Sequence, residues 1–373
     1  MKRFFTLFFV LLMCTFKNVA FSQSPDIDQS FLDWDANNDK RLAKSELPPG
    51  PRRNFERVDT NNDGFISLDE HRRFLTRGKP SPESRLPKVS NKIELHANIF
   101  YAGTKNPRQS LHVMTPKERK TKKRLPLIVF IHGGGWRQGD KNRGISQTTR
   151  FVESGRFVSA TIGYRLSNEA KWPAQIHDCK AAIRWLKAHS KDYGFDVDRI
   201  CVMGTSAGGH LVAMLGVTSG VESMEGTIGH HTTESSRVTC VVDFSGPTNF
   251  LTMNDFPGKI DHDAKDSPES MLIDGAIQKN RERAMSAVPV SYVTEDDSPI
   301  LILHGTADPL VPFDQSVQFH RLLIQSEIDA TLIPISDAGH GFRSSAIDAR
   351  IDQFLNRQFF GSTERVSSQP IKL

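Results

Sequence analysis

A serine between glycines is the first candidate for chemistry in this chain. The segment Gly204-Thr205-Ser206-Ala207-Gly208 follows an apolar, β-branched run at residues 200–203 and precedes a helical pattern. Such a strand-to-helix turn is strained, and small flanking residues let it lift the serine above the sheet at the start of a helix. We therefore predict that Ser206 is a nucleophile. G-x-S-x-G occurs by chance in many chains, so the prediction depends on its partners.

The first partner is a glycine-rich segment, His132-Gly133-Gly134-Gly135-Trp136, which follows the apolar run at residues 125–131. Acyl transfer needs backbone N–H groups aimed at the oxygen that becomes negatively charged. One such group follows the nucleophile, and another comes from a loop after a neighbouring strand. We predict an oxyanion hole made by the N–H groups of Gly133 or Gly134 and of Ala207.

A serine hydroxyl also needs a base, and the base needs a carboxylate that orients it. When the nucleophilic serine lies on such a strand-to-helix turn, the three residues follow one another in the chain in the order serine, acid, histidine. Asp308 follows the apolar run at 300–303, and His340 follows the run at 331–335. Both lie where open α/β sheets place their sites, on loops after the carboxyl ends of strands. Asp308 and His340 complete the predicted triad.

Three other residues compete for these roles. His304 and His210 lie near the same rim of the predicted sheet, but His304 directly ends a strand and precedes the acid. Asp337 could replace Asp308, although only two residues separate it from His340, a spacing that suits a turn better.

The elements that position these residues alternate along residues 93–360, where short β-branched runs follow amphipathic helical patterns such as 174–189 and 316–325. The predicted strands span residues 125–131, 157–162, 200–203, 238–244, 300–303 and 331–335. Alternation of this kind predicts an α/β fold with a mainly parallel sheet and helices on both faces. Two polar segments, 217–237 and 246–292, are expected over the carboxyl ends of the strands. Residues 361–373 are expected to form a disordered tail.

Several segments resemble one esterase family. The HGGGW segment followed by Gly139-Asp140-Lys141, the GTSAGGH segment and the HGTADPLVP segment are similar to those of BD-FAE-type α/β-hydrolases. This group stands beside the hormone-sensitive-lipase-like esterases, and the resemblance covers about residues 88–358. It implies the α/β-hydrolase fold and carboxylic-ester hydrolysis, extending to acetyl or feruloyl esters of polysaccharides.

Other functions stay open at this point. A small-molecule carboxylesterase or lipase would use the same residues. Prolyl oligopeptidase-like peptidases share the HG-x-x-D-x-x-VP segment, but they usually carry an aromatic residue where this chain has Ala207, and a propeller that is missing here. A calcium-dependent binding protein on an inactive hydrolase scaffold is the opposing class, and a complete triad argues against it.

The stretch at residues 26–76 carries a sequence pattern that predicts calcium binding. Residues 59–70 match the twelve-residue EF-hand loop, with oxygen donors at positions 1, 3, 5, 9 and 12 and Gly64 at the sharp turn. The predicted ligands are Asp59, Asn61, Asp63, Phe65 through its carbonyl, Ser67 and Glu70.

An upstream loop repeats the pattern less completely. Its predicted ligands are Asp35, Asn37, Asp39, Arg41 through its carbonyl, and Glu46. Lys40 stands where the EF-hand loop has a glycine, and the positive φ required there costs a lysine about 1 kcal/mol. Ala43 stands at position 9 and supplies no side-chain oxygen. This site should therefore bind calcium more weakly. Leu42 and Ile66 occupy equivalent positions and can pair across the loops. The two loops resemble secreted, all-α EF-hand modules. The calcium bound there is expected to be structural, and no cofactor is expected for catalysis.

Residues 1–22 are typical of a signal peptide, because Lys2 and Arg3 precede a short apolar run and the small-x-small pattern Ala20-Phe21-Ser22. The expected location is secreted or periplasmic, without stable membrane insertion after cleavage. Removal of this segment lowers the net charge from +5 to +2. So small a charge argues against a nucleic-acid partner, and the expected binding partner is an ester substrate.

Residues 77–92 have the Pro- and Ser-rich composition of a linker. Three cysteines would remain in the mature chain, an odd number that does not form a disulfide framework.

Overall fold

The computed structural model describes residues 27–76 and 86–373. Their contacts form two units that divide after Arg85. The predicted signal peptide, residue 26 of the predicted EF-hand pair and residues 77–85 of the predicted linker lie outside the described residues. The rest of that linker belongs to the second unit, because Leu86 and Val89 pack against a buried cluster around Ile93.

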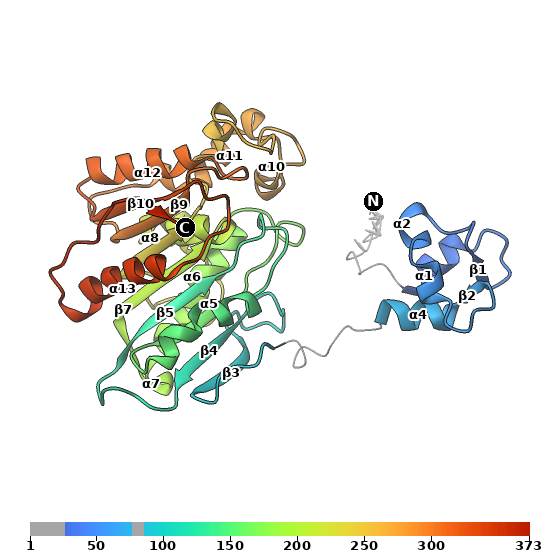
Figure 1. The fold of residues 1–373 in the computed structure, drawn as a ribbon, viewed down its shortest axis with the longest axis horizontal. Coiled ribbons are helices and arrows are strands. Elements are labelled where there is room, and N and C mark those ends of the chain that lie inside the picture. The colour runs from blue at the N-terminus through green and yellow to red at the C-terminus, as the bar shows by residue number, and fades with distance from the viewer. Residues whose placement is uncertain (1–26, 77–85) are drawn as a thin grey trace, which may run out of the picture. The chain divides into compact units, whose positions relative to one another are not determined.

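A nine-stranded sheet forms the centre of the unit at residues 86–373, in the order β11-β10-β9-β8-β7-β5-β6-β4-β3 (Figure 1). The strands are β3 (Ile93–Phe100), β4 (Ser110–Pro116), β5 (Leu125–Ile131), β6 (Val158–Ile162), β7 (Phe195–Thr205), β8 (Cys240–Phe244), β9 (Ile300–Gly305), β10 (Ala330–Ser336) and β11 (Ile371–Lys372). Strands β5 to β11 pair in parallel, whereas β3 and β4 pair antiparallel. The predicted α/β architecture with a mainly parallel sheet is confirmed.

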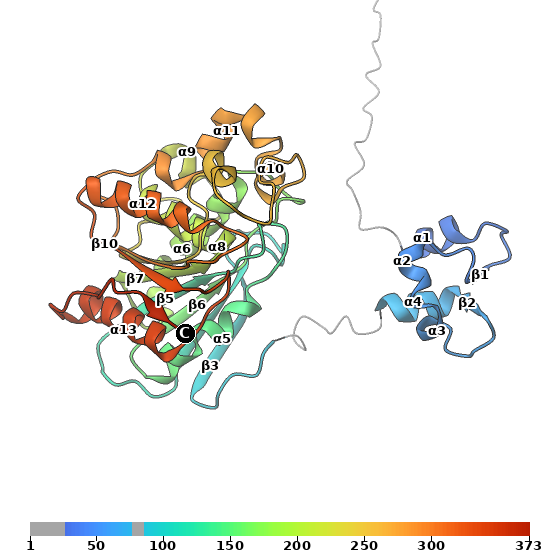
Figure 2. The ribbon, with the colours of Figure 1, turned by 45° about the horizontal axis from the view of Figure 1, so that its top comes forward.

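Helices cover both faces of this sheet (Figures 1 and 2). Helices α6 (Ala174–Ala188), α8 (Ala207–Val217) and α12 (Phe313–Gln325) lie on one face, and α5 (Asn142–Glu153) and α13 (Ser345–Phe360) lie on the other. Alternate residues of β5 divide between two cores, because successive strand side chains point to opposite faces. Leu127 and Val129 join the core of α6 and α8, whereas Ile128 and Phe130 join that of α5 and α13.

Shorter helical segments connect these elements. They are α7 (Ser190–Tyr193), α9 (Glu222–Glu225), η1 (Phe250–Asp255), α10 (Pro268–Ile273), η2 (Ile277–Lys279), α11 (Arg281–Ser286) and η3 (Pro289–Ser291). Most of them fall in the segment 246–292, one of the two polar segments expected to cover the carboxyl ends of the strands.

The expectation for the other polar segment, 217–237, is wrong. Helix α8 runs back along the sheet, and the following residues pack beside α6. There the carboxylate of Glu225 in α9 lies 2.6 Å from Lys180 Nζ and 3.2 Å from Arg184 Nη1. No residue of 217–237 lines the cavity described below.

The prediction that residues 361–373 are disordered is also wrong. Ile371 and Lys372 form β11, which pairs in parallel with Ile335 and Ser336 of β10. Val366 and Ile371 are buried in the core that contains α13. Isolated apolar side chains within a polar stretch were too weak a pattern to predict this strand.

The unit at residues 27–76 contains α1 (Ile27–Trp34), β1 (Arg41–Ala43), α2 (Pro49–Arg52), α3 (Phe55–Val58), β2 (Phe65–Ser67) and α4 (Leu68–Thr76). Leu42 and Ile66 face each other in the antiparallel pair β1–β2 and are fully buried with Phe31. The predicted pairing of the two loops is confirmed, but the two short strands correct the all-α description.

Helices with the length and apolar character needed to cross a membrane do not occur in residues 27–76 and 86–373.

Candidate active site

The loops that carry the predicted site meet where the strand order reverses. Strand β5 pairs with β7 on one side and with β6 on the other. The chain leaves β5 toward β6 but leaves β7 toward β8, in the opposite direction across the sheet. Open α/β sheets bind ligands in the crevice at such a switch point. Here it brings the glycine-rich loop after β5 beside the turn after β7.

Ser206 occupies a sharp turn between β7 and α8, with φ 57° and ψ −122°. A positive φ in a non-glycine residue costs about 1–3 kcal/mol and is concentrated at functional sites. The flanking glycines are required by contact: a Cβ on Gly204 would meet Gly208 O at 2.2 Å, and one on Gly208 would meet Ile131 O at 2.2 Å. The predicted strained turn is therefore present.

The predicted oxyanion donors surround this turn. Ala207 is the first residue of α8, so its N–H has no acceptor within the helix. Gly133 lies against the turn so closely that a Cβ there would meet Thr205 O at 2.4 Å and Ser206 Cβ at 3.2 Å. Among the hydrogen bonds of residues 86–373, none uses the N–H of Gly133 or Gly134. These N–H groups are therefore free of acceptors in residues 86–373, and those of Gly133 and Ala207 lie beside Ser206.

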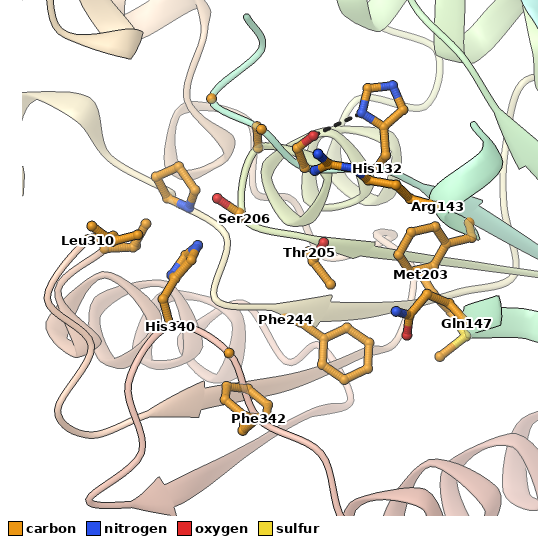
Figure 3. Close-up of a pocket in the computed structure, with 18 of the residues that line it drawn as sticks. His132, Arg143, Gln147, Met203, Thr205, Ser206, Phe244, Leu310, His340 and Phe342 are labelled. Atoms are coloured by element: carbon orange, nitrogen blue, oxygen red, sulfur yellow. Dashed lines mark hydrogen bonds between the residues drawn. The ribbon is translucent and has the colours of Figure 1, made fainter. Parts of the chain in front are cut away.

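His340 follows β10 and Asp308 follows β9, and the structure brings their side chains together. His340 Nδ1 lies 2.7 Å from Asp308 Oδ2. Figure 3 shows the His340 ring and the Ser206 hydroxyl pointing toward each other, and both residues line the same cavity. No hydrogen bond joins these two side chains in the described part of the chain. Catalytic hydrogen bonds of free enzymes are often long and shorten with substrate.

The Asp308 carboxylate is held on both oxygens. Leu310 N and Val311 N donate to Oδ1 at 2.8 and 3.1 Å, and His304 Nε2 lies 3.2 Å from Oδ2. Burial alone would raise the pKa of Asp308, but the hydrogen bonds of His304 and His340 lower that pKa well below its usual value. Asp308 is therefore an ionised partner for a histidine that gains a proton.

The competing residues have other roles. His304 is fully buried and its Nδ1 lies 2.6 Å from Ser316 Oγ, so it contacts the acid from behind and does not reach the cavity. His210 Nε2 lies 2.6 Å from Ala287 O, and burial lowers the pKa of His210 to about 4. Asp337 is exposed to solvent. Sequence reasoning missed the contact of His304 with Asp308, although their spacing of four residues was visible.

A cavity of about 630 Å³ opens above Ser206. Its apolar wall includes Met203, Phe244, Leu310 and Phe342, and Figure 3 shows these side chains around the serine. The segment 246–292 contributes further residues, as expected for a cover over the carboxyl ends of the strands. They are Pro247, Ile260, His262, Pro268 and Glu269. None of these wall residues was predicted.

The two acidic loops at residues 27–76 share one conformation. In the first, Asp35 accepts hydrogen bonds from the N–H groups of Asp39 and Lys40; in the second, Asp59 accepts them from Asp63 and Gly64. The turn residues agree, with φ 67° at Lys40 and 84° at Gly64. The two loops therefore bend in the same way.

The glutamates that close the loops also match. Glu46 accepts from Ala43 N at 2.7 Å, and Glu70 accepts from Ser67 N at 3.0 Å. Burial tends to raise the pKa of Glu70, but hydrogen bonds from Ser67 and Thr60 lower that pKa to about 2.

The structure thus places the predicted oxygen donors of each loop around one turn. In the described ranges, no three His, Cys, Asp or Glu side chains stand together as a closed metal site. The carboxylates instead bond to loop N–H groups. The side chains of each loop are rich in oxygen, the donor type that Ca²⁺ prefers.

Comparisons with known proteins agree with the fold and the site. Esterase LipC of Mycobacterium tuberculosis is 29% identical over 323 residues, which cover 80% of this chain and 75% of LipC. The solved structure of a truncated carbohydrate esterase from gut microbiota is 29% identical, with a TM-score of 0.66, and the match covers 73% of this chain and 99% of that one. A bifunctional GH43-CE protein of Bacteroides eggerthii is 30% identical, with a TM-score of 0.65, over 73% of this chain and 36% of its own.

The fold and these relatives define an α/β-hydrolase that hydrolyses carboxylic esters. The BD-FAE family model matches residues 111–323, and the chain belongs to the BD-FAE family.

Proposed function

We propose that this protein is a secreted serine esterase that works through an acyl-enzyme on Ser206. The observation that carries the proposal is the 2.7 Å contact of His340 Nδ1 with Asp308 Oδ2 beside a strained serine in the same cavity. An acid-bound Nδ1 leaves Nε2 of the ring as the proton acceptor.

In the proposed mechanism, Ser206 Oγ attacks the ester carbonyl carbon while its proton passes to His340 Nε2. The charge on the imidazolium is balanced by Asp308, and the carbonyl oxygen, now negative, accepts hydrogen bonds from Ala207 N–H and from Gly133 or Gly134 N–H. His340 then returns the proton to the leaving alcohol oxygen. Water repeats the two transfers on the acyl-enzyme, which releases the acid and restores Ser206.

The substrate class we propose is an acetyl or feruloyl ester on a polysaccharide. The likeness to a carbohydrate esterase from gut microbiota supports this class, and a cavity of about 630 Å³ has room for an acyl group together with part of the alcohol. A small-molecule ester is the second candidate, which the apolar residues Met203, Phe244 and Phe342 favour.

Replacement of the nucleophile tests the mechanism. Ser206→Ala should lower kcat on p-nitrophenyl acetate by about 10⁶-fold and abolish labelling by a fluorophosphonate probe, without a change in melting temperature beyond a few degrees. Retention of more than about a tenth of the activity would exclude Ser206 as the nucleophile. Labelling of the unmodified protein, lost in Ser206→Ala, also separates an active hydrolase from a binding protein on an inactive scaffold, which the probe would not label.

We also propose that the loops at residues 35–46 and 59–70 bind structural calcium. Calcium would supply a positive centre that ties each loop to its closing glutamate. Asp59, Asp63 and Glu70 would hold it in the second loop, and Asp35, Asp39 and Glu46 in the first, with the remaining donors from Asn37, Asn61 and Ser67 and from the carbonyls of Arg41 and Phe65. The matched conformations of the two loops support this assignment.

Export is proposed from residues 1–22, whose sequence is typical of a signal peptide. Sequencing the N-terminus of protein recovered outside the cytoplasm should show a start near Gln23. A start at Met1 in that material would contradict the proposal.

A further inference from the structure

Two polar side chains that the proposed mechanism does not use lie in the wall of the Ser206 cavity. His262 belongs to the loop before α10, and Glu269 belongs to the first turn of α10. Both line the cavity, although His262 is only 2% exposed and Glu269 only 4%. They are the polar side chains that the segment 246–292 brings to this wall.

The backbone around each side chain is fixed independently. His262 N donates to Asn254 Oδ1 at 2.8 Å, and Asn254 Nδ2 donates to Asp261 Oδ1 at 2.7 Å. Ser267 Oγ caps α10 by accepting from Ser270 N at 3.0 Å. The positions of the two side chains therefore do not depend on a bond between them.

The two side chains contact each other, but they do not form a hydrogen bond. His262 Nδ1 lies 3.1 Å from Glu269 Oε2, but the two atoms lack the alignment of a hydrogen bond. Neither ring nitrogen of His262 nor Oε2 of Glu269 has a hydrogen-bond partner among the described residues. A buried polar group without a partner costs about 1–3 kcal/mol, so a ligand group that bonds to this pair would recover that free energy.

The pair lies close to the catalytic loop. A Cβ on Gly135 would meet Pro268 Cβ at 3.3 Å, so the start of α10 touches the loop that carries the oxyanion donors. A group bound between His262 and Glu269 would belong to the part of the substrate that lies next to the ester.

We propose that His262 and Glu269 form a subsite that binds a hydroxyl group of the substrate, and this proposal rests on the proposed esterase function. A hydroxyl can donate to the Glu269 carboxylate and accept from an imidazole N–H of His262, so it satisfies both partners. An alkyl group would satisfy neither, and a substrate carboxylate would be repelled by Glu269. The preferred substrate is thus an ester of a polyol or sugar with a free hydroxyl near the scissile bond.

A matched pair of esters tests the subsite on the full chain. One is a mono-acetylated methyl xylopyranoside with free hydroxyl groups, and the other is the same ester with these hydroxyl groups methylated. The unmodified protein should prefer the free-hydroxyl ester by at least about tenfold in kcat/KM, the factor expected for one hydrogen-bonded pair. Absence of this preference in the unmodified protein would overturn the proposal without any variant.

Two variants then assign the preference to the pair. Glu269→Gln and His262→Phe should each reduce the ratio of kcat/KM between the two esters by about tenfold. Glu282→Gln makes the same change of carboxylate to amide on the exposed face of α11 and should leave the ratio as it is. If the first two variants slow both esters equally, the pair has only a structural role and the proposal is wrong.

Failure of the subsite is distinguishable from failure of the proposed function. Ser206→Ala should abolish turnover of both esters together with fluorophosphonate labelling. If turnover survives in Ser206→Ala, the proposed function is wrong; if turnover is lost but the unmodified protein shows no preference, only the subsite is wrong.

Discussion

Nε2 of the buried His304 imidazole lies 3.2 Å from Oδ2 of the Asp308 carboxylate. This is the same oxygen that contacts His340 on the cavity side. His304 Nε2 also lies 2.9 Å from Val311 O, and since both neighbours are acceptors, this nitrogen carries the proton. One carboxylate oxygen is thus held from behind by a fixed donor while it orients the proposed base in front.

Replacement of the acid should be costly. Asp308→Asn should lower kcat on p-nitrophenyl acetate by about 10⁴-fold, because an amide can favour the wrong tautomer of the proposed base and does not balance its charge. Asp337→Asn is the matched control, since Asp337 is exposed and lies in the turn before His340. If the Asp337 variant proved the more damaging of the two, the acid would have been misassigned.

The glycine loop should tolerate no side chain at Gly133. Gly133→Ala places a Cβ 2.4 Å from Thr205 O, so either the loop or the serine turn must move. We expect a loss of about 10²–10³-fold in kcat, similar to that for removal of one oxyanion donor. Gly258→Ala provides the comparison, because its Cβ would meet only Pro309 O at an ordinary 3.6 Å. Equal activity in the two variants would argue against a tight loop.

Asp243, buried at the end of β8 behind the serine turn, should make stability depend on pH. Burial raises the pKa of Asp243 from 3.8 to about 7, against a hydrogen bond from Gly246 N–H that lowers it. The unfolded chain therefore loses this proton first, and the contribution of Asp243 to stability declines as the pH rises from about 4 to about 7.

Asp243→Asn removes that titration. The free energy of unfolding of the variant, relative to the unmodified protein, should rise with pH over this range by up to about 1.4 kcal/mol per pH unit. Thermal melts at successive pH values measure the difference. Parallel curves for the two proteins would show that Asp243 does not titrate in this window.

Calcium should bind the second loop more tightly than the first. Gly64 adopts its positive φ without strain and Ser67 adds an oxygen, whereas Lys40 and Ala43 offer neither advantage. In calorimetric titrations, Glu70→Gln should weaken calcium binding more than Glu46→Gln does, with dissociation constants of about 10⁻⁴–10⁻³ M, the range typical of extracellular EF-hand modules.

A protein shortened to residues 86–373 should keep most of its activity on p-nitrophenyl acetate, with EDTA or with calcium. This start retains Leu86 and Val89, which pack on the cluster around Ile93. If the shortened protein folds but is inactive, the acidic loops take part in catalysis and the separation of the two units is wrong.

The central strands and the serine turn were predictable because their signals are local. Residues 125–131 form β5 as predicted, and the glycines around Ser206 follow directly from the backbone contacts of the turn. Strands β3 and β4 were not predicted. β3 is only partly buried, and β4 buries Ser110 and His112, whose polar side chains obscure the pattern.

The wall of the cavity was less predictable because it depends on tertiary contacts. His262 and Glu269 come from a segment without regular periodicity, and only the folded loop and α10 bring them together. His304 could be placed near the acid from its spacing, but burial and the contact with Ser316 decide that it lies behind the acid and does not act as the base.

The pairing of β11 with β10 has a consequence for the behaviour of the chain in solution. Unpaired strand edges promote association between molecules, and proteins avoid this by covering them or keeping them short. The last residues cover part of the long β10 edge with a two-residue strand. Removal of residues 362–373, or a bulky tag that displaces Ile371, would expose the β10 edge together with the apolar surface under Val366, and should cause aggregation.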